Sequence, residues 1–136
     1  MIKPIMKSEF FLRLPSEDAG PDDAATGQDL LDTLHEHERE CVGIAANMIG
    51  VRKRIICVKD GNRTLLMYNP QILEQVNAYQ TSKGCLSLIG ERPCTRYRRI
   101  KVEYLDENFI HRIKNFSGYT AEIIQHEIDH CNGIVI

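Results

Sequence analysis

The residues best suited to chemistry lie near the C-terminus, in the stretch Gln125-His126-Glu127-Ile128-Asp129-His130. Residues four apart on an α-helix lie on the same face, so His126 and His130 can present two imidazole nitrogens to one point. This H-E-x-x-H pattern is typical of a site for a first-row metal ion. Glu127 lies about a hundred degrees round the helix, where it can act as general base and then acid on a metal-bound water. The alternative is a surface helix that carries these residues by chance.

A catalytic metal site normally takes a third protein ligand. Cys85 is the best candidate, because Gly84 lets the backbone approach the ion and Lys83 favours the thiolate that binds it. Cys94 and Cys131 compete with it. Cys131 directly follows the second histidine and so points about a hundred degrees away from it, and Cys94 can be a buried core residue. Taken alone, Cys85 is more often a small core residue than a ligand.

The segment 41–50, Cys-Val-Gly-Ile-Ala-Ala-Asn-Met-Ile-Gly, is small and apolar and contains two glycines. Small residues allow another backbone or a ligand to come close. A buried turn that packs against the core explains the same composition equally well.

The elements that position these residues begin with an irregular stretch from Met1 to Asp23, broken by prolines. Asp22 or Asp23 can cap a helix that runs to about Glu40, with apolar residues at helical spacing. His35 and His37 lie on this helix among glutamates, and a solvated charged face explains them better than metal binding.

From Arg54 onward the pattern predicts strands, separated by turn signals. Asp60-Gly61-Asn62 predicts a hairpin, and Asn69-Pro70 predicts another turn. Ser117 can cap a terminal helix, which Gly133 closes in the C′ position. The expected strands are Arg54–Val58, Thr64–Tyr68, Ile72–Tyr79, Ile100–Leu105 and Phe109–Phe116, the last two joined through Asp106-Glu107-Asn108.

These elements give an α+β fold: mostly antiparallel sheets packed around a C-terminal metal-binding helix, with one N-terminal helix. Residues 1–136 are expected to form a single domain, since 43% hydrophobic and 26% charged content is that of an ordinary globular protein. A net charge of −2 gives no electrostatic case for nucleic acid or membrane binding. The five cysteines are scattered, and no signal peptide accompanies them, so reduced thiols in the cytoplasm are expected.

Together these stretches resemble the peptide deformylase family. Gly43-Ile44-Ala45-Ala46, Gly84-Cys85-Leu86-Ser87 and Gln125-His126-Glu127-Ile128-Asp129-His130 match its three motifs in the family's order. Met67-Tyr68-Asn69-Pro70 resembles the strand end before the middle motif. The likeness covers nearly the whole chain, and it makes Cys85 a predicted metal ligand.

The resemblance implies a cytoplasmic, metal-dependent hydrolase that removes the formyl group from the N-terminal methionine of new polypeptides. Cys85, His126 and His130 would hold one divalent ion, commonly Fe²⁺ in this family, with Zn²⁺, Ni²⁺ or Co²⁺ able to take its place. Glu127 would take a proton from the metal-bound water that attacks the formyl carbon, and return it to the leaving amine.

The resemblance also implies where the peptide lies. An N-formylmethionyl peptide or nascent chain would add a strand beside Val42-Gly43-Ile44, near Gly84, and the backbone N–H of Leu86 would donate to the oxyanion. The methionine pocket would include residues before His126 on the terminal helix, namely Tyr119, Glu122 and Ile123. Oligomeric state and the preferred peptide do not follow from the sequence.

The chain departs from the family pattern at several positions. Met48 stands where the family has a glutamine whose amide helps to hold the oxyanion, and a thioether cannot donate a hydrogen bond. Asn47 beside it could substitute if the loop shifts. Cys41 replaces the first glycine of its motif, and Lys83 replaces an acidic residue that serves as an ion-pair partner.

Three functional hypotheses follow. The first is a working deformylase that is slow or shifted in substrate. The second is a catalytically weakened homologue that binds metal and peptide N-termini. The third is a different metallohydrolase, such as a peptidase, which would use the same two histidines and depend little on Cys85.

Overall fold

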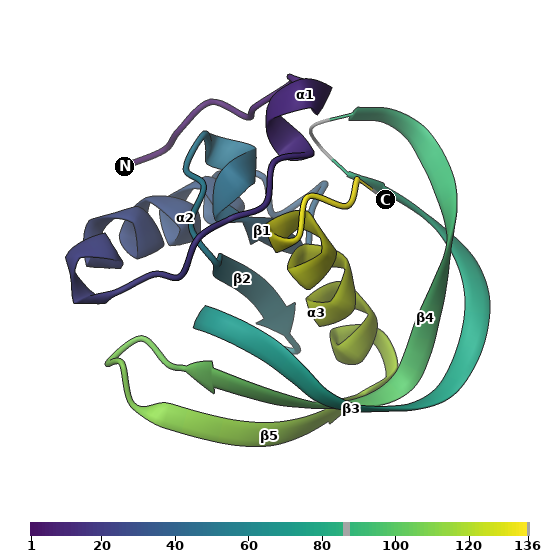
Figure 1. Ribbon diagram of the computed structural model, residues 1–136. Helices are drawn as coiled ribbons and strands as arrows, with labels where there is room; N and C mark the ends of the chain where they lie inside the picture. Colours follow the sequence, from purple (N-terminus) through teal and green to yellow (C-terminus); the bar gives the residue numbers. More distant parts are fainter. Residues whose placement is uncertain (86–87, 136) are drawn as a thin grey trace.

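The computed structural model describes the backbone of residues 1–85 and 88–135, and the side chains of those ranges except 83–90 and 92. An antiparallel sheet forms its frame, with the strands in sequence order (Figure 1). The strands are β1 (Gly43–Ala45), β2 (Ile55–Asp60), β3 (Arg63–Cys85), β4 (Leu88–Leu105) and β5 (His111–Ser117). The helices are α1 (Glu9–Leu12), α2 (Ala24–Glu36) and α3 (Gly118–Cys131), with 3₁₀ helices η1 (Pro21–Asp23) and η2 (Ala46–Ile49).

Strand β2 separates two hydrophobic cores, because successive side chains of a strand point to opposite faces. Ile55 and Cys57 belong to the core that contains Leu30 of α2. Ile56 and Val58 belong to the core that contains Ile124 of α3. Both faces of β2 are therefore buried, which explains its unbroken apolar run and fixes both helices against the same strand.

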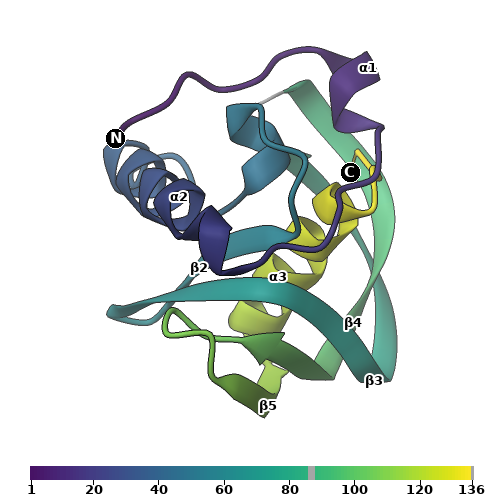
Figure 2. The ribbon, with the colours of Figure 1, turned by 60° about the vertical axis from the view of Figure 1, so that its left-hand side comes forward.

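The long β3–β4 hairpin curves around α3, as Figures 1 and 2 show from two directions. Its inner side chains, such as Met67, Ile100 and Val102, pack in the same core as α3. The terminal helix is thus held between the hairpin on one side and β1 and β2 on the other. This arrangement confirms the predicted α+β class with a C-terminal helix packed on an antiparallel sheet.

The predicted N-terminal helix is shorter than expected. Asp23 occupies its N-cap position, but the helix ends at Glu36 instead of about Glu40, and residues 37–40 form turns. Only polar residues follow Leu34 up to position 40, so a further helical turn would bury nothing. The stretch before Asp23 is less irregular than predicted, because it contains α1 and η1.

The turn predicted at Asn69-Pro70 is wrong, and Ile72–Tyr79 is not a separate strand. Strand β3 continues through both, with the register of its pairing to β4 shifted between Tyr68 and Gln71. Asn69 has a φ of 53°, so the local irregularity lies within the strand. Proline cannot donate to a ladder but is tolerated at such irregularities, and pairing with β4 restores the strand beyond it.

The terminal helix ends as the sequence predicts. Gly133 has a φ of 76° and its N–H donates to the His130 carbonyl, while the Ile134 N–H donates to the Asp129 carbonyl. These two hydrogen bonds form a Schellman motif, which requires the left-handed conformation that glycine supplies. Among the described residues, no helix has the length and apolar character needed to cross a membrane.

Candidate metal centre

Helix α3 brings the two predicted histidine ligands together. The Nε2 atoms of His126 and His130 lie 3.3 Å apart, and the rings meet edge to face at 77°. Two nitrogens bound to one tetrahedral ion at 2.0–2.1 Å are about 3.3 to 3.4 Å apart, so this spacing fits a shared metal ion. Both side chains are buried. Burial, with a smaller contribution from Arg96, lowers the pKa of His130 to about 4, which keeps its imidazole in the neutral form that binds metals.

Glu127 lies in the same buried region, with 3% of its surface exposed. Burial raises the pKa of its carboxyl to about 8, although the positive charge of Arg96 opposes this. Its Oε1 atom has no hydrogen-bond partner among the described residues. A buried carboxylate oxygen of this kind requires a partner, and a water held next to the two imidazoles would supply one.

Strand β1 approaches Glu127 closely because residue 43 is a glycine. A Cβ atom added to Gly43 would lie 3.0 Å from Glu127 Oε2 and 2.6 Å from the Cγ2 atom of Ile123. The glycine-rich segment and the H-E-x-x-H helix therefore meet at this point. Gly43 is required by packing against α3, and its partner Ile123 is one of the predicted pocket residues.

Arg96 and Asp129 complete the polar surroundings, and the sequence did not single them out for this role. Arg96 is buried on β4, and its Nη1 donates to Asp129 Oδ2 at 2.6 Å. Its Nη2 lies 3.5 Å from Nδ1 of His126. The pair fixes the position of a buried cation beside the first histidine, and Asp129 lies on the same helix as both histidines. A lone arginine in a strand gives no signal for such a contact.

Gln125, the first residue of the motif, binds α3 to β4. Its Oε1 accepts from the Tyr97 N–H at 2.8 Å, and its Nε2 donates to the carbonyl oxygens of Tyr97 and Ala121. One side chain thus uses both halves of its amide to hold the helix against the strand. It fixes the rotation of α3 immediately before His126.

The residues at positions 47 and 48 are both buried within η2. Met48 Sδ accepts from the Ala45 N–H at 3.5 Å. The Asn47 Nδ2 donates to the His130 carbonyl at 2.8 Å. One donor of the Asn47 amide is therefore bonded to α3, a contact between residues 83 positions apart that no local pattern predicts.

The side chain of Cys85, the third predicted ligand, is not among the described side chains, and the same is true at its neighbours Lys83 and Gly84. Leu86 lies outside the described residues altogether. The backbone places Cys85 at the end of β3, paired with Leu88 at the start of β4. Among the side chains that are described, no three histidine, cysteine or acidic groups gather at one point. The role of Cys85 therefore stays a prediction.

The competing cysteines are both buried. Cys131 packs in the core shared with α3, and burial raises the pKa of its thiol to about 12, so it is a neutral core residue. His35 and His37 lie within ion-pair distance of Glu38 and Glu40. The charged segment was predicted, but only His35 lies on α2, because residues 37–40 form turns.

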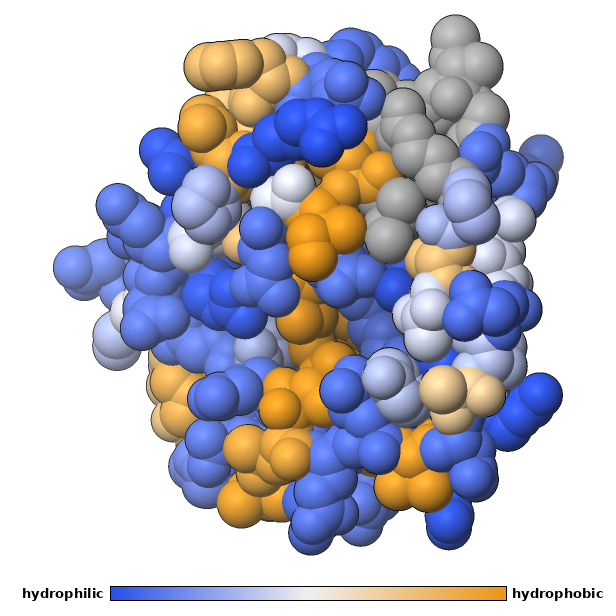
Figure 3. All heavy atoms as spheres, turned by 45° about the vertical axis from the view of Figure 1, so that its right-hand side comes forward, coloured by the Kyte–Doolittle hydropathy of each residue, from blue (hydrophilic) through white to orange (hydrophobic). Residues whose placement is uncertain are grey.

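The remaining predicted pocket residues lie on the first turns of α3. Ile123 is buried against Gly43, whereas 61% of Tyr119 is exposed. Glu122 is half-buried. Figure 3 shows a strip of apolar side chains down one face of the molecule, flanked by hydrophilic ones.

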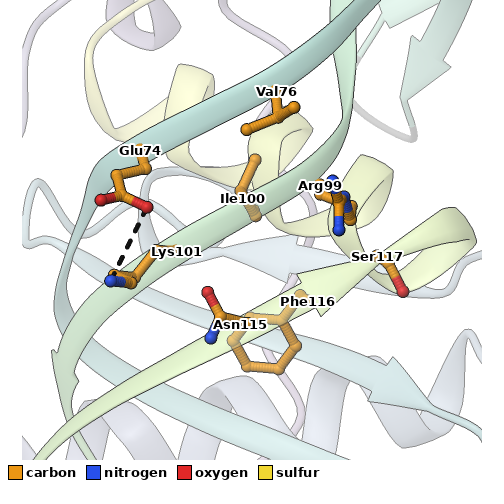
Figure 4. A pocket seen from close by; sticks show the side chains of 8 residues that line it. All are labelled: Glu74, Val76, Arg99, Ile100, Lys101, Asn115, Phe116 and Ser117. Atoms are coloured by element: carbon orange, nitrogen blue, oxygen red, sulfur yellow. Dashed lines mark ion pairs between the residues drawn. The ribbon is translucent and has the colours of Figure 1, made fainter.

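A separate hollow of about 420 Å³ opens over β3, β4 and β5 (Figure 4). Glu74 and Lys101 form an ion pair across it at 3.6 Å. Its other lining residues are Val76, Arg99, Ile100, Asn115, Phe116 and Ser117. The hollow contains none of the predicted site residues and has no buried catalytic group of its own.

Comparison with known proteins agrees with this geometry. The model of the polypeptide deformylase family matches residues 6–136. A peptide deformylase of Clostridium beijerinckii is 51% identical over 136 residues, which cover 100% of both chains. The crystal structure of peptide deformylase from Thermus thermophilus is similar with a TM-score of 0.89 and 32% identity, covering 99% of this chain and 84% of that one. The Met-Ala-Ser-bound crystal structure of a class I type b peptide deformylase from Acinetobacter baumannii is similar with a TM-score of 0.88 and 29% identity. The similarity covers 99% of this chain and 97% of that one.

Proposed function

The chain belongs to the peptide deformylase family, and from this premise we propose that α3 and the β3–β4 hairpin hold a divalent ion at which N-formylmethionyl peptides lose their formyl group. The observation that carries the proposal is the 3.3 Å separation of the His126 and His130 Nε2 atoms, with buried Glu127 between them in sequence. The family is metal-dependent, and this spacing suits a metal ion.

His126, His130 and Cys85 are the proposed ligands. We take Fe²⁺ as the native ion, and a Cys/His/His set also accepts Zn²⁺, Ni²⁺ or Co²⁺. When bound, the ion acidifies a water molecule and polarises the formyl oxygen. Both histidines are buried, and burial lowers the pKa of His130, which favours the neutral imidazole that binds a metal.

Glu127 moves the proton. Its carboxylate takes a proton from the attacking water and passes it to the nitrogen of the leaving amine, so that water and the formamide become formate and a free N-terminus. A Cβ atom at Gly43 would lie 3.0 Å from Glu127 Oε2, so this carboxyl group is beside β1. The base therefore lies next to the strand proposed to hold the substrate.

The peptide is proposed to extend the sheet at β1. Among the described strands, β1 pairs with β2 on one side, which makes it an edge strand. Edge strands bind extended peptides through backbone groups on their open side, here proposed along Val42, Gly43 and Ile44. The Val42 carbonyl already accepts from the Lys59 N–H at 2.8 Å, and the Gly43 carbonyl accepts from Cys41 Sγ at 2.6 Å. Binding of Met-Ala-Ser by the Acinetobacter baumannii relative supports a peptide ligand. Ile123, Tyr119 and Glu122 would then border the methionine side chain.

The oxyanion is proposed to be held by the Leu86 N–H without help from position 48. The thioether of Met48 accepts a hydrogen bond from Ala45 and has no hydrogen to donate. This observation favours a second candidate function, a homologue that binds metal and peptide N-termini and turns them over slowly. Family membership counts against the peptidase hypothesis.

Formate release tests the proposal. Purified protein loaded with Fe²⁺ or Ni²⁺ should release formate from formyl-Met peptides, and Glu127→Ala should abolish release while the protein still binds the metal. Absence of turnover with every metal would contradict a working deformylase. Retained metal and peptide binding in that case would support the weakened homologue.

The substrate class also fits the expected setting. N-formylmethionyl chains are the products of translation, so we place the reaction in the cytoplasm. The sequence gives no charge-based case for a nucleic acid partner, since its net charge is −2.

A further inference from the structure

The second histidine lies in the last turn of α3, where helices are least secure. The last four carbonyl groups of an α-helix have no partner within the helix, and helix ends fray. His130 is followed in α3 by one residue, Cys131. A metal ligand in this place needs restraint from outside the helix.

The fold supplies that restraint from several directions. The Cys131 carbonyl accepts from the Ser16 N–H at 2.8 Å, and the Gly133 N–H donates to the His130 carbonyl at 3.0 Å. The only side chain that donates to the His130 carbonyl among the described residues is Asn47. Asn47 differs from these backbone partners because it donates through its side chain and comes from the glycine-rich motif.

Asn47 is itself firmly held. It is 1% exposed, and η2 is closed around it by hydrogen bonds from Gly50 N–H to its carbonyl at 3.1 Å and from Met6 N–H to the Met48 carbonyl at 2.7 Å. Its Oδ1 has no hydrogen-bond partner among the described residues. An unpaired buried oxygen is unfavourable, so the position of this side chain is set by the bond that its Nδ2 makes.

We infer that Asn47 is a positioning residue for the metal centre: its amide fixes the His130 end of α3 to the glycine-rich motif. The inference rests on the proposed role of His130 as a ligand. Through the 2.8 Å bond to the His130 backbone, Asn47 sets where that imidazole stands relative to His126 and to β1. The amide donor used in this bond is then not free to replace the missing glutamine at the oxyanion.

The test compares two amide-to-acid changes at the same end of α3. Asn47→Asp keeps the shape and removes the donor, and it places a carboxylate against the His130 carbonyl. Asn132→Asp is the matched control, because Asn132 is exposed and its Oδ1 accepts from Arg54 Nη1 at 2.7 Å. A carboxylate at position 132 preserves that bond. Asn47→Leu, which lacks both donor and charge, carries the test if Asn47→Asp does not fold.

The readouts are Co²⁺ affinity by competition with a chelator and the visible spectrum of the Co²⁺-saturated protein. We expect the Asn47 variants to bind Co²⁺ about 10- to 100-fold more weakly and to change the spectrum at saturation. Asn132→Asp should match the wild type in both. A purely structural role would lower thermal stability and leave the saturated spectrum unchanged.

Two results would overturn the inference: wild-type affinity and spectrum in the Asn47 variants, or an equal loss in Asn132→Asp. His126→Ala and His130→Ala separate this outcome from failure of the proposed function. If neither histidine change weakens Co²⁺ binding, the metal site itself is wrong. If both weaken it while the Asn47 variants do not, only the positioning role is wrong.

Discussion

At the scale of single residues, positions 47 and 48 are two places where this chain departs from the family pattern. The family's glutamine would bring an amide to the oxyanion, whereas Met48 brings a sulfur that accepts from the Ala45 N–H. Asn47 brings an amide, but one of its donors is bonded to His130. Met48 thus bonds within η2 and Asn47 bonds η2 to α3, and the proposed oxyanion site has one side-chain donor fewer than the family pattern.

Met48→Gln should therefore raise the turnover number. A glutamine carbonyl at this position can accept from the Ala45 N–H, as the sulfur does, and its amide nitrogen is then free to donate to the oxyanion. Since one such donor is typically worth about 100- to 1000-fold in rate, we expect an increase of at least tenfold in formate release at saturating metal and peptide.

Met48→Leu controls for that experiment, because leucine has a similar volume and no donor. It should leave the rate near that of the wild type. An unchanged rate in Met48→Gln would mean that another group already stabilises the oxyanion.

At the scale of elements, the contact between β1 and α3 assembles the site. A methyl group at position 43 would lie 2.6 Å from Ile123 Cγ2, closer than real Cβ contacts. Gly43→Ala should push β1 away from α3 and lower the free energy of unfolding by about 1–3 kcal/mol. It should also reduce formate release, because the distance between Glu127 and β1 changes. Thermal unfolding and the assay measure the two effects. Gly20→Ala, which has nothing within 4 Å, should change neither.

The Schellman turn after α3 gives a second prediction at this scale. Gly133 has a positive φ, and a Cβ added there would clash with the Arg13 carbonyl oxygen. Gly61 also has a positive φ but nothing within 4 Å. Gly61→Ala should cost about 1 kcal/mol of unfolding free energy from backbone strain alone. Gly133→Ala should cost clearly more in the same denaturation experiment, and equal losses would show that the Arg13 contact yields easily.

Elements whose signals are local were predictable. The i, i+4 histidines, the glycine closing α3 and the Asp60-Gly61-Asn62 hairpin depend on neighbours in sequence, and the structure has all of them. Asn69-Pro70 failed because its local preference for a turn is overridden by pairing of β3 with β4. Contacts of Arg96 and Asn47 with α3 join residues far apart in sequence, where periodicity carries no information.

At the scale of the whole molecule, the proposed ion should stabilise the fold. It would bind ligands of the native state that the unfolded chain does not hold together, and a ligand at a hundred times its dissociation constant adds about 2.7 kcal/mol. A chelator should therefore lower Tm by several degrees, and Co²⁺ or Ni²⁺ should restore it. Glu127→Ala should keep this metal-dependent shift, and His130→Ala should lose it. A Tm that ignores metal in the wild type would contradict a resident ion.

The order of strands in the sheet also sets how the protein comes together. Each strand pairs with the one that follows it in the chain, so the sheet can grow through successive hairpins that close over short distances. The contact of β1 with α3 is different, because β2, β3, β4 and β5 all lie between these two elements in sequence. We expect this long loop closure to come late during folding. A chain in which β1 and α3 have not yet come together would have most of its sheet formed but would be inactive.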